Sequence, residues 1–147
     1  MAEAAKALGK AGSFVFQGKT YRLSPFNYDM VAMFELWLEQ RAWDSVERTR
    51  HLTSEEVYER RLEAMAKLIA SGHFAFGGQA AAEAAKSLPG QKRILFLMLT
   101  ACPDNEDVTE ELVDRILQAN MANVMSLVNE ANADPNGACP TMASGNP

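Results

Sequence analysis

Between Tyr28 and Arg50, apolar residues recur with the spacing of an α-helix, and this long pattern restricts the chain to a largely helical fold. The central stripe consists of Val31, Phe34, Leu38 and Ala42. Other apolar residues lie beside or away from that stripe: Met30, Met33, Leu36, Trp37 and Trp43. A surface helix needs only one apolar face, so this helix is either central in its domain or part of an interface with a partner.

A short β-hairpin is predicted before this helix. Apolar and polar residues alternate from Phe14 to Leu23 around the turn Gln17-Gly18-Lys19. Ser24-Pro25 ends the strand, because the residue before proline favours extended geometry, and Ser24 or Asn27 can cap the helix. An isolated hairpin is only marginally stable in water, so we expect this one to pack on the helix that follows.

Helix start and stop signals divide the rest of the chain. Thr53 and Glu56 have the spacing of a capping box and predict a helix through Ile69. The glycine-rich linker 71–78 should place Phe74 and Phe76 in the core, before an alanine-rich helix over 78–88. The run Ile94–Leu99 predicts the most buried helix, and Thr109 and Asn120 are predicted to cap the last two helices.

These patterns predict a mainly α fold in which an N-terminal β-hairpin packs on a compact bundle of about five helices. A chain of 147 residues is the usual size of one domain. We place that domain at residues 13–133. Residues 1–12 are alanine-rich and residues 134–147 are turn formers, so we expect a flexible arm and a disordered tail.

Charge and composition exclude several classes of function. The net charge is −5 and the basic residues are interleaved with acidic ones, so nucleic acid is not an expected partner. The longest apolar run is far short of the roughly 20 residues of a membrane helix, so no membrane association is expected. Cys102 and Cys139 belong to no metal-binding spacing, so we expect reduced thiols, no zinc site and a cytoplasmic protein.

No catalytic constellation is visible in the sequence. His51 and His73 are the only histidines, and neither has the spacing of a metal-ligand pair. The segment 72–78 lacks the ending of a phosphate loop, and no serine lies in a nucleophile elbow. We therefore predict a non-enzymatic protein without a cofactor.

Surplus apolar residues are the strongest indication of a binding role. Methionine-rich helical faces can re-pack around varied partners, although core packing is their commoner role. The predicted partner-binding residues are Met30, Met33, Leu36, Trp37, Trp43, Met121 and Met125. Of the two tryptophans, Trp43 is expected to be the more exposed, because Trp37 adjoins the central stripe.

The segment FVFQGKTYRLSPFNYDMVAMFELWLEQRA resembles the start of the tail assembly chaperones of bacteriophages and prophages, in which a GKxYxLxP hairpin precedes a helical body. The matching positions are Gly18, Lys19, Tyr21, Leu23, Pro25, Phe34-Glu35 and Trp37-Leu38. The segment VTEELVDRILQANMANVMSLVNEA is similar to the paired helices that follow a proline-containing loop in those proteins, here Cys102-Pro103-Asp104.

The resemblance implies a helper in the host cytoplasm that binds the tape-measure protein and tail-tube subunits during tail assembly. Separately from the resemblance, a homo-oligomer is left open as a partner. An apolar helical face would shield aggregation-prone client helices. Two alternatives remain open: a structural tail or head-to-tail connector subunit retained in the virion, and a host helical adaptor unrelated to phage.

Overall fold

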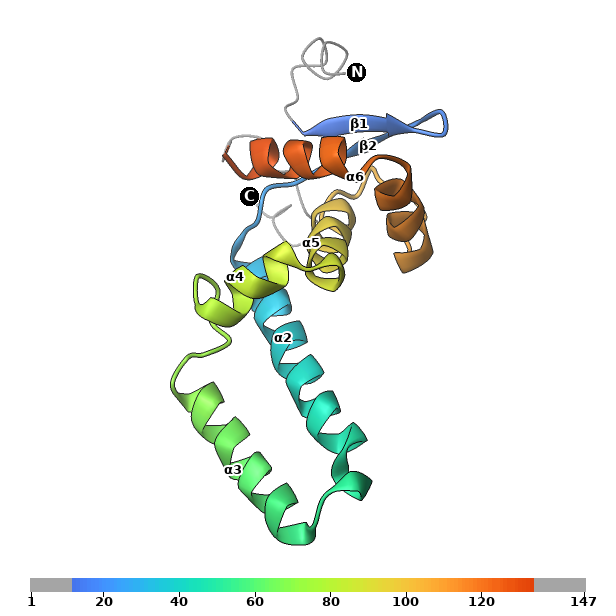
Figure 1. Ribbon diagram of the computed structural model, residues 1–147. Helices are drawn as coiled ribbons and strands as arrows, with labels where there is room; N and C mark the ends of the chain where they lie inside the picture. The colour runs from blue at the N-terminus through green and yellow to red at the C-terminus, as the bar shows by residue number, and fades with distance from the viewer. Residues whose placement is uncertain (1–11, 134–147) are drawn as a thin grey trace. The chain divides into compact units, whose positions relative to one another are not determined.

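The computed structural model describes residues 12–133, and these are mostly helical (Figure 1). In chain order, the elements are β1 (Ser13–Phe16), β2 (Lys19–Arg22), α2 (Tyr28–Arg48), the short 3-10 helix η1 (Arg50–Leu52), α3 (Glu55–Ala70), α4 (Gln79–Lys86), α5 (Leu88–Thr100) and α6 (Glu110–Ala133). The predicted mainly α fold with an N-terminal hairpin and about five helices is confirmed. The predicted arm, apart from Gly12, and the predicted tail lie outside the described residues.

Contacts within the chain divide it into two compact units. In the described residues, the first unit comprises 12–30 with 88–133, and the second comprises 31–87. The hairpin, α5 and α6 belong to the first unit, while most of α2 with α3 and α4 belongs to the second. A single domain over residues 13–133 stays a prediction.

The hairpin of the first unit closes on a two-residue turn. Phe14 pairs with Tyr21 and Phe16 with Lys19 in the antiparallel register, so the turn is Gln17-Gly18 and Lys19 already belongs to β2. Both turn residues have positive φ, 51° and 79°, which is the geometry of a type I′ turn. The rings of Phe14 and Tyr21 stack with centroids 5.7 Å apart on the buried side of the hairpin.

The hairpin packs on α6, whereas the sequence had suggested the helix that follows it. Figure 1 shows β1 beside the C-terminal part of α6. Gly12 approaches α6 so closely that a Cβ there would lie 2.7 Å from the Cβ of Ala131. Packing against a helix from the far end of the chain supplies the burial that a two-stranded hairpin lacks alone.

Helix α5 forms the apolar centre of the first unit. Leu95, Met98 and Leu99 are 0% exposed, as the dense apolar run predicts. Ile94 and Phe96 in the same run are only partly buried. The chain leaving β2 is fixed to α5 by a hydrogen bond from Ser24 N–H to the Met98 carbonyl (3.2 Å).

The capping residues of α6 are those that the sequence predicts. Thr109 Oγ1 accepts a hydrogen bond from Leu112 N–H (3.1 Å) at the start of α6. Asn120 has non-helical angles (φ −163°, ψ 69°) and its Oδ1 accepts from Asn123 N–H (3.4 Å), so it kinks α6 and caps the second half.

The starts of α2 and α3 follow their sequence signals with one correction. Asn27 Oδ1 accepts from Met30 N–H (2.9 Å) where α2 begins. Ser54, not Thr53, caps α3, because its Oγ accepts from Val57 N–H while Thr53 Oγ1 donates to the Arg50 carbonyl. The predicted capping box with Glu56 is therefore wrong by one residue.

The linker after α3 places only one of its two phenylalanines in the core. Gly72 has φ 77° and ends α3 with the paired hydrogen bonds of a Schellman motif. Phe74 is 8% exposed, but Phe76 is 50% exposed, so the prediction that both rings enter the core is wrong for Phe76.

Cys102 is buried at the end of α5 and is disulfide-bonded. The expectation of reduced thiols is therefore wrong for this residue. Cys139 lies outside the described residues. None of the helices within residues 12–133 has both the length and the apolar composition needed to cross a membrane.

Candidate functional site: two apolar surfaces

Three of the predicted partner-binding residues lie on one side of α2. Met33 and Leu36 are 52% and 64% exposed, and Trp43 is partly buried. Residues three and seven positions apart share a helix face, so Met33, Leu36 and Trp43 lie along one face of α2. We call these three residues the outer face of α2.

Met30 and Trp37 do not belong to the outer face. Met30 is 3% exposed and is therefore a core residue. Trp37 stacks on Phe34 with ring centroids 5.5 Å apart, and the guanidinium of Arg41 lies 4.7 Å from the Trp37 ring. Trp37 and Trp43 are both partly buried, and the greater exposure expected for Trp43 stays a prediction.

Met121 and Met125 lie on α6, in the other unit. Met121 is 38% exposed and Met125 is partly buried. The seven predicted residues are divided between the two units, so they do not form one surface within either unit.

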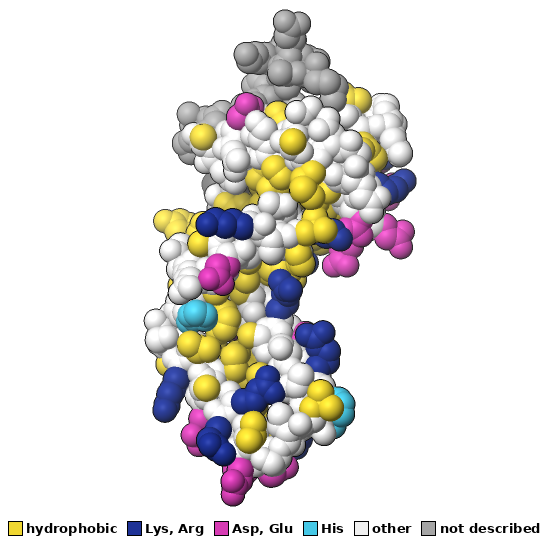
Figure 2. Space-filling model, in the orientation of Figure 1, with side chains coloured by type: hydrophobic (Ala, Val, Ile, Leu, Met, Phe, Trp, Pro, Cys, Tyr) yellow, Lys and Arg dark blue, Asp and Glu magenta, His cyan; other side chains and the backbone are white. Residues whose placement is uncertain are grey.

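Helices α2 and α3 run in opposite directions (Figure 1). Figure 2 shows hydrophobic side chains, in yellow, between these two helices. Near η1, the hydroxyl of Tyr58 donates a hydrogen bond to Glu47 Oε1, and the Arg50 guanidinium lies 4.4 Å from the Tyr58 ring. The bond to Glu47 raises the pKa of Tyr58, and burial raises it further.

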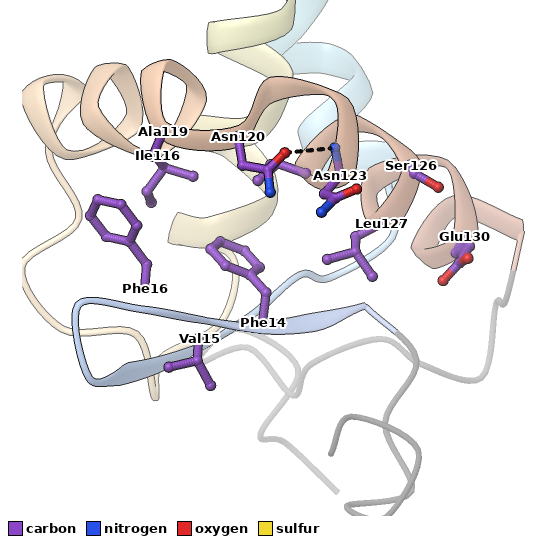
Figure 3. A pocket seen from close by; sticks show the side chains of 11 residues that line it. Phe14, Val15, Phe16, Ile116, Ala119, Asn120, Asn123, Ser126, Leu127 and Glu130 are labelled. Carbon is purple, nitrogen blue, oxygen red and sulfur yellow. Dashed lines mark hydrogen bonds between the residues drawn. The ribbon is translucent and has the colours of Figure 1, made fainter. Parts of the chain in front are cut away.

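A second apolar surface lies in the first unit, in a groove between β1 and the kinked α6. The groove has a volume of about 330 Å³. Figure 3 shows the rings of Phe14 and Phe16 directed from β1 toward α6, where Ile116 and Leu127 lie. Val15 also lines the groove, although its side chain points away from α6.

Polar groups occur at a few positions of this groove. Asn120, at the kink in α6, and Asn123, one turn after it, present their side-chain amides near the middle of the groove (Figure 3). Among the described residues, Glu130 is the only charged one that lines the groove. The chemistry of the groove is therefore that of an apolar binding site with a small number of hydrogen-bonding groups and one negative charge.

No part of this groove was predicted as a site. Its residues belong to β1 and α6, about a hundred positions apart in the chain, and they meet only because the hairpin packs on α6 rather than on α2. The one local signal was Asn120, which the sequence marks as a helix cap and which produces the kink.

Within residues 12–133, no group of three or more histidine, cysteine or acidic side chains is placed to hold a metal ion. His73 contacts the ring of Phe74 edge-on at 5.0 Å.

Comparison with known proteins identifies no relative. No family model, curated protein or solved structure matches this chain. The two apolar surfaces are therefore interpreted from their own chemistry.

Proposed function

We propose that this chain is a non-enzymatic binding protein whose outer face of α2 receives an apolar segment of a client protein. The supporting observation is the exposure of Met33 and Leu36 on the side of α2 opposite to its buried residues Phe34 and Leu38. Single exposed apolar residues are ordinary on protein surfaces. A helix that is apolar on two opposite sides packs one of them into the core, and the other can bind a partner.

The resemblance to phage tail assembly chaperones suggests the clients. In this proposal, the outer face of α2 covers apolar helices of a tape-measure protein until tail-tube subunits replace it, and the protein acts in the host cytoplasm. A flexible methionine and a leucine suit this task, because they can adapt to different client side chains.

Co-expression with the client tests the proposal. The client is a tape-measure protein, and the measurement is the fraction of that client recovered in the soluble fraction. The double variant Met33→Glu with Leu36→Glu should fold and should no longer keep the client soluble, because two charges would face the apolar client segment.

Ser45→Glu is the matched control, since Ser45 is an exposed residue of the same helix away from the outer face. It adds charge without altering the outer face and should protect the client as the parent chain does. Equal protection by the double variant would refute the proposal. Mass spectrometry of purified particles separates the alternative: a structural subunit would be present in every particle, and a chaperone would not.

A further inference from the structure

We propose that the outer face of α2 pairs with an α-helix of the client that carries lysine or arginine residues on both sides of its apolar row. This inference rests on the proposed function, because it names the chemistry of the client segment that the same face would receive. All the residues that carry it belong to α2 within the second unit.

The first support is the spacing of side chains along the outer face. Four residues make up what we call the a/d row of α2: Met33, Leu36, Gln40 and Trp43. Successive members are three, four and three positions apart, which is the spacing of the a and d positions of a heptad. Side chains at these positions lie along one side of a helix and pack against a second helix.

The a/d row also limits the length and register of the partner. From Met33 to Trp43 it spans about 15 Å at the rise of an α-helix, so it suits a short helical segment and not an extended coiled coil. Gln40 is its one polar member, and a single polar residue at an a position fixes the register of paired helices. The client helix is therefore expected to present asparagine or glutamine opposite Gln40.

The second support is the sign of the charges beside the a/d row. Glu39 and Asp44 occupy the g and e positions, which border the row on opposite sides. Within residues 12–133, neither carboxylate forms an ion pair. Asp44 Oδ1 accepts a hydrogen bond from Gln40 Nε2 (3.0 Å), which holds this carboxylate beside the row. Both groups can therefore pair with cations of a helix that packs on the row.

The basic residues of α2 are directed elsewhere. Arg41 and Arg48 occupy b positions, which lie farther around the helix than e and g. The guanidinium of Arg41 lies 4.7 Å from the ring of Trp37, which stacks on the buried Phe34. Negative charge alone therefore borders the a/d row.

The same charges argue against a second copy of this chain as the partner. If two outer faces pair, Glu39 and Asp44 of one copy meet carboxylates of the other, whichever way the helices run. Like charges at these positions are unfavourable, whereas lysine or arginine there forms ion pairs. Charge complementarity therefore favours a basic helix of a different protein.

The probe is a fluorescein-labelled peptide of three heptads, with leucine at a and d, one central asparagine at an a position, and lysine at e and g. A second peptide has glutamate in place of each lysine. Fluorescence anisotropy measures the binding of each peptide to the full chain. The lysine peptide should bind about tenfold more tightly, and this preference should shrink as the salt concentration rises.

A charge exchange separates the outer face from the net charge of the chain. The double variant Glu39→Lys with Asp44→Lys should reverse the preference, so that the glutamate peptide binds more tightly than the lysine peptide. Glu59→Lys with Glu63→Lys is the matched control, because it makes the same change in net charge on exposed residues of α3. It should retain the preference for the lysine peptide. Circular dichroism checks that both variants keep the helical content of the parent chain.

The outcomes distinguish this inference from the proposed function. Equal affinities of the parent chain for the two peptides, with both lost in Met33→Glu with Leu36→Glu, would overturn the basic client and leave the apolar docking face intact. Binding that this variant does not weaken would overturn both proposals.

Three further results would overturn the inference alone, since co-expression tests the proposed function on the client itself. The first is no binding of the lysine peptide at about 1 mM. The second is an equal effect of the charge exchanges on α2 and α3. The third is a dimer in sedimentation equilibrium that Met33→Glu with Leu36→Glu dissociates, which would assign the outer face to a second copy.

Discussion

The backbone N–H of Phe76 donates a 2.6 Å hydrogen bond to Oε2 of Glu35, across 41 positions of the chain. The ring of Phe76 meets Phe34 edge-on at a centroid distance of 6.2 Å although Phe76 is 50% exposed. Glu35 therefore fixes the linker between α3 and α4 to α2. The half-exposed ring of Phe76 would by itself contribute little burial to hold the linker there.

Removing this carboxylate should loosen the linker. Hydrogen bonds to charged groups contribute more than neutral ones, so Glu35→Ala should speed amide hydrogen exchange at Phe76 by about tenfold or more. Glu39→Ala is the control, because Glu39 is on the same helix and makes no hydrogen bond to the linker within the described residues. Unchanged exchange at Phe76 in Glu35→Ala would contradict the assignment.

The two sides of α2 should differ in their effect on stability. Leu38 is 7% exposed, so Leu38→Ala should lower the free energy of unfolding by about 2–5 kcal/mol through lost burial and a cavity. Leu36 is 64% exposed, and Leu36→Ala should change it by about 0.5 kcal/mol or less. Chemical denaturation measures both. Similar losses would mean that Leu36 is also buried in solution.

The hydrogen bond between Tyr58 and Glu47 should make stability depend on pH. The raised pKa of Tyr58 means that the folded protein holds this proton more tightly than the unfolded chain does. Its contribution to stability is complete below the unfolded pKa of about 10 and is lost as the pH rises through the folded pKa.

Glu47→Ala should therefore lower the pKa of Tyr58, which tyrosinate absorbance measures in an alkaline titration. Tyr58→Phe identifies the component to follow, since Tyr21 and Tyr28 are the other tyrosines of the chain. Glu59→Ala, which removes an exposed carboxylate of α3, should leave that component in place. An unaltered titration in Glu47→Ala would show that the bond is not formed in solution.

The amide of Asn105 should stabilise the first unit. It bonds to both backbone groups of Arg22 and donates to the Leu99 carbonyl (2.8 Å), so it joins β2 to the end of α5. Asn105→Ala should lower the free energy of unfolding by about 1–3 kcal/mol, because these backbone groups lose their partner. Asn129→Ala, an exposed position of α6, should change it by about 0.5 kcal/mol or less.

The hairpin turn should respond to backbone geometry alone. Gly18 has φ 79° and nothing lies within 4 Å of a Cβ built there, so Gly18→Ala tests strain without a clash. It should destabilise the protein by about 1 kcal/mol. Gln17→Asn should stabilise it in thermal unfolding, since asparagine tolerates positive φ better than glutamine. A gain from Gly18→Ala would contradict the turn geometry.

Local chemistry along the chain determined most of the secondary structure. The sequence predicted the helix caps at Asn27, Thr109 and Asn120, because a cap is a contact within one helical turn. It also predicted the burial of Leu95, Met98 and Leu99, because a dense run of apolar residues is stable only in the core. The error at Thr53 was a shift of one residue between two adjacent hydroxyl side chains, either of which can accept the same N–H.

Tertiary structure decided where these elements meet, and with that the candidate sites. The pattern of α2 indicated surplus apolar surface, but only packing separated the buried Met30 from the exposed Met33 and Leu36. The groove between β1 and α6 depends on contacts between segments about a hundred residues apart, and periodicity within one segment carries no information about such a pairing. Sequence alone thus determined which faces are apolar, and only the fold decided which of them remain uncovered within each unit.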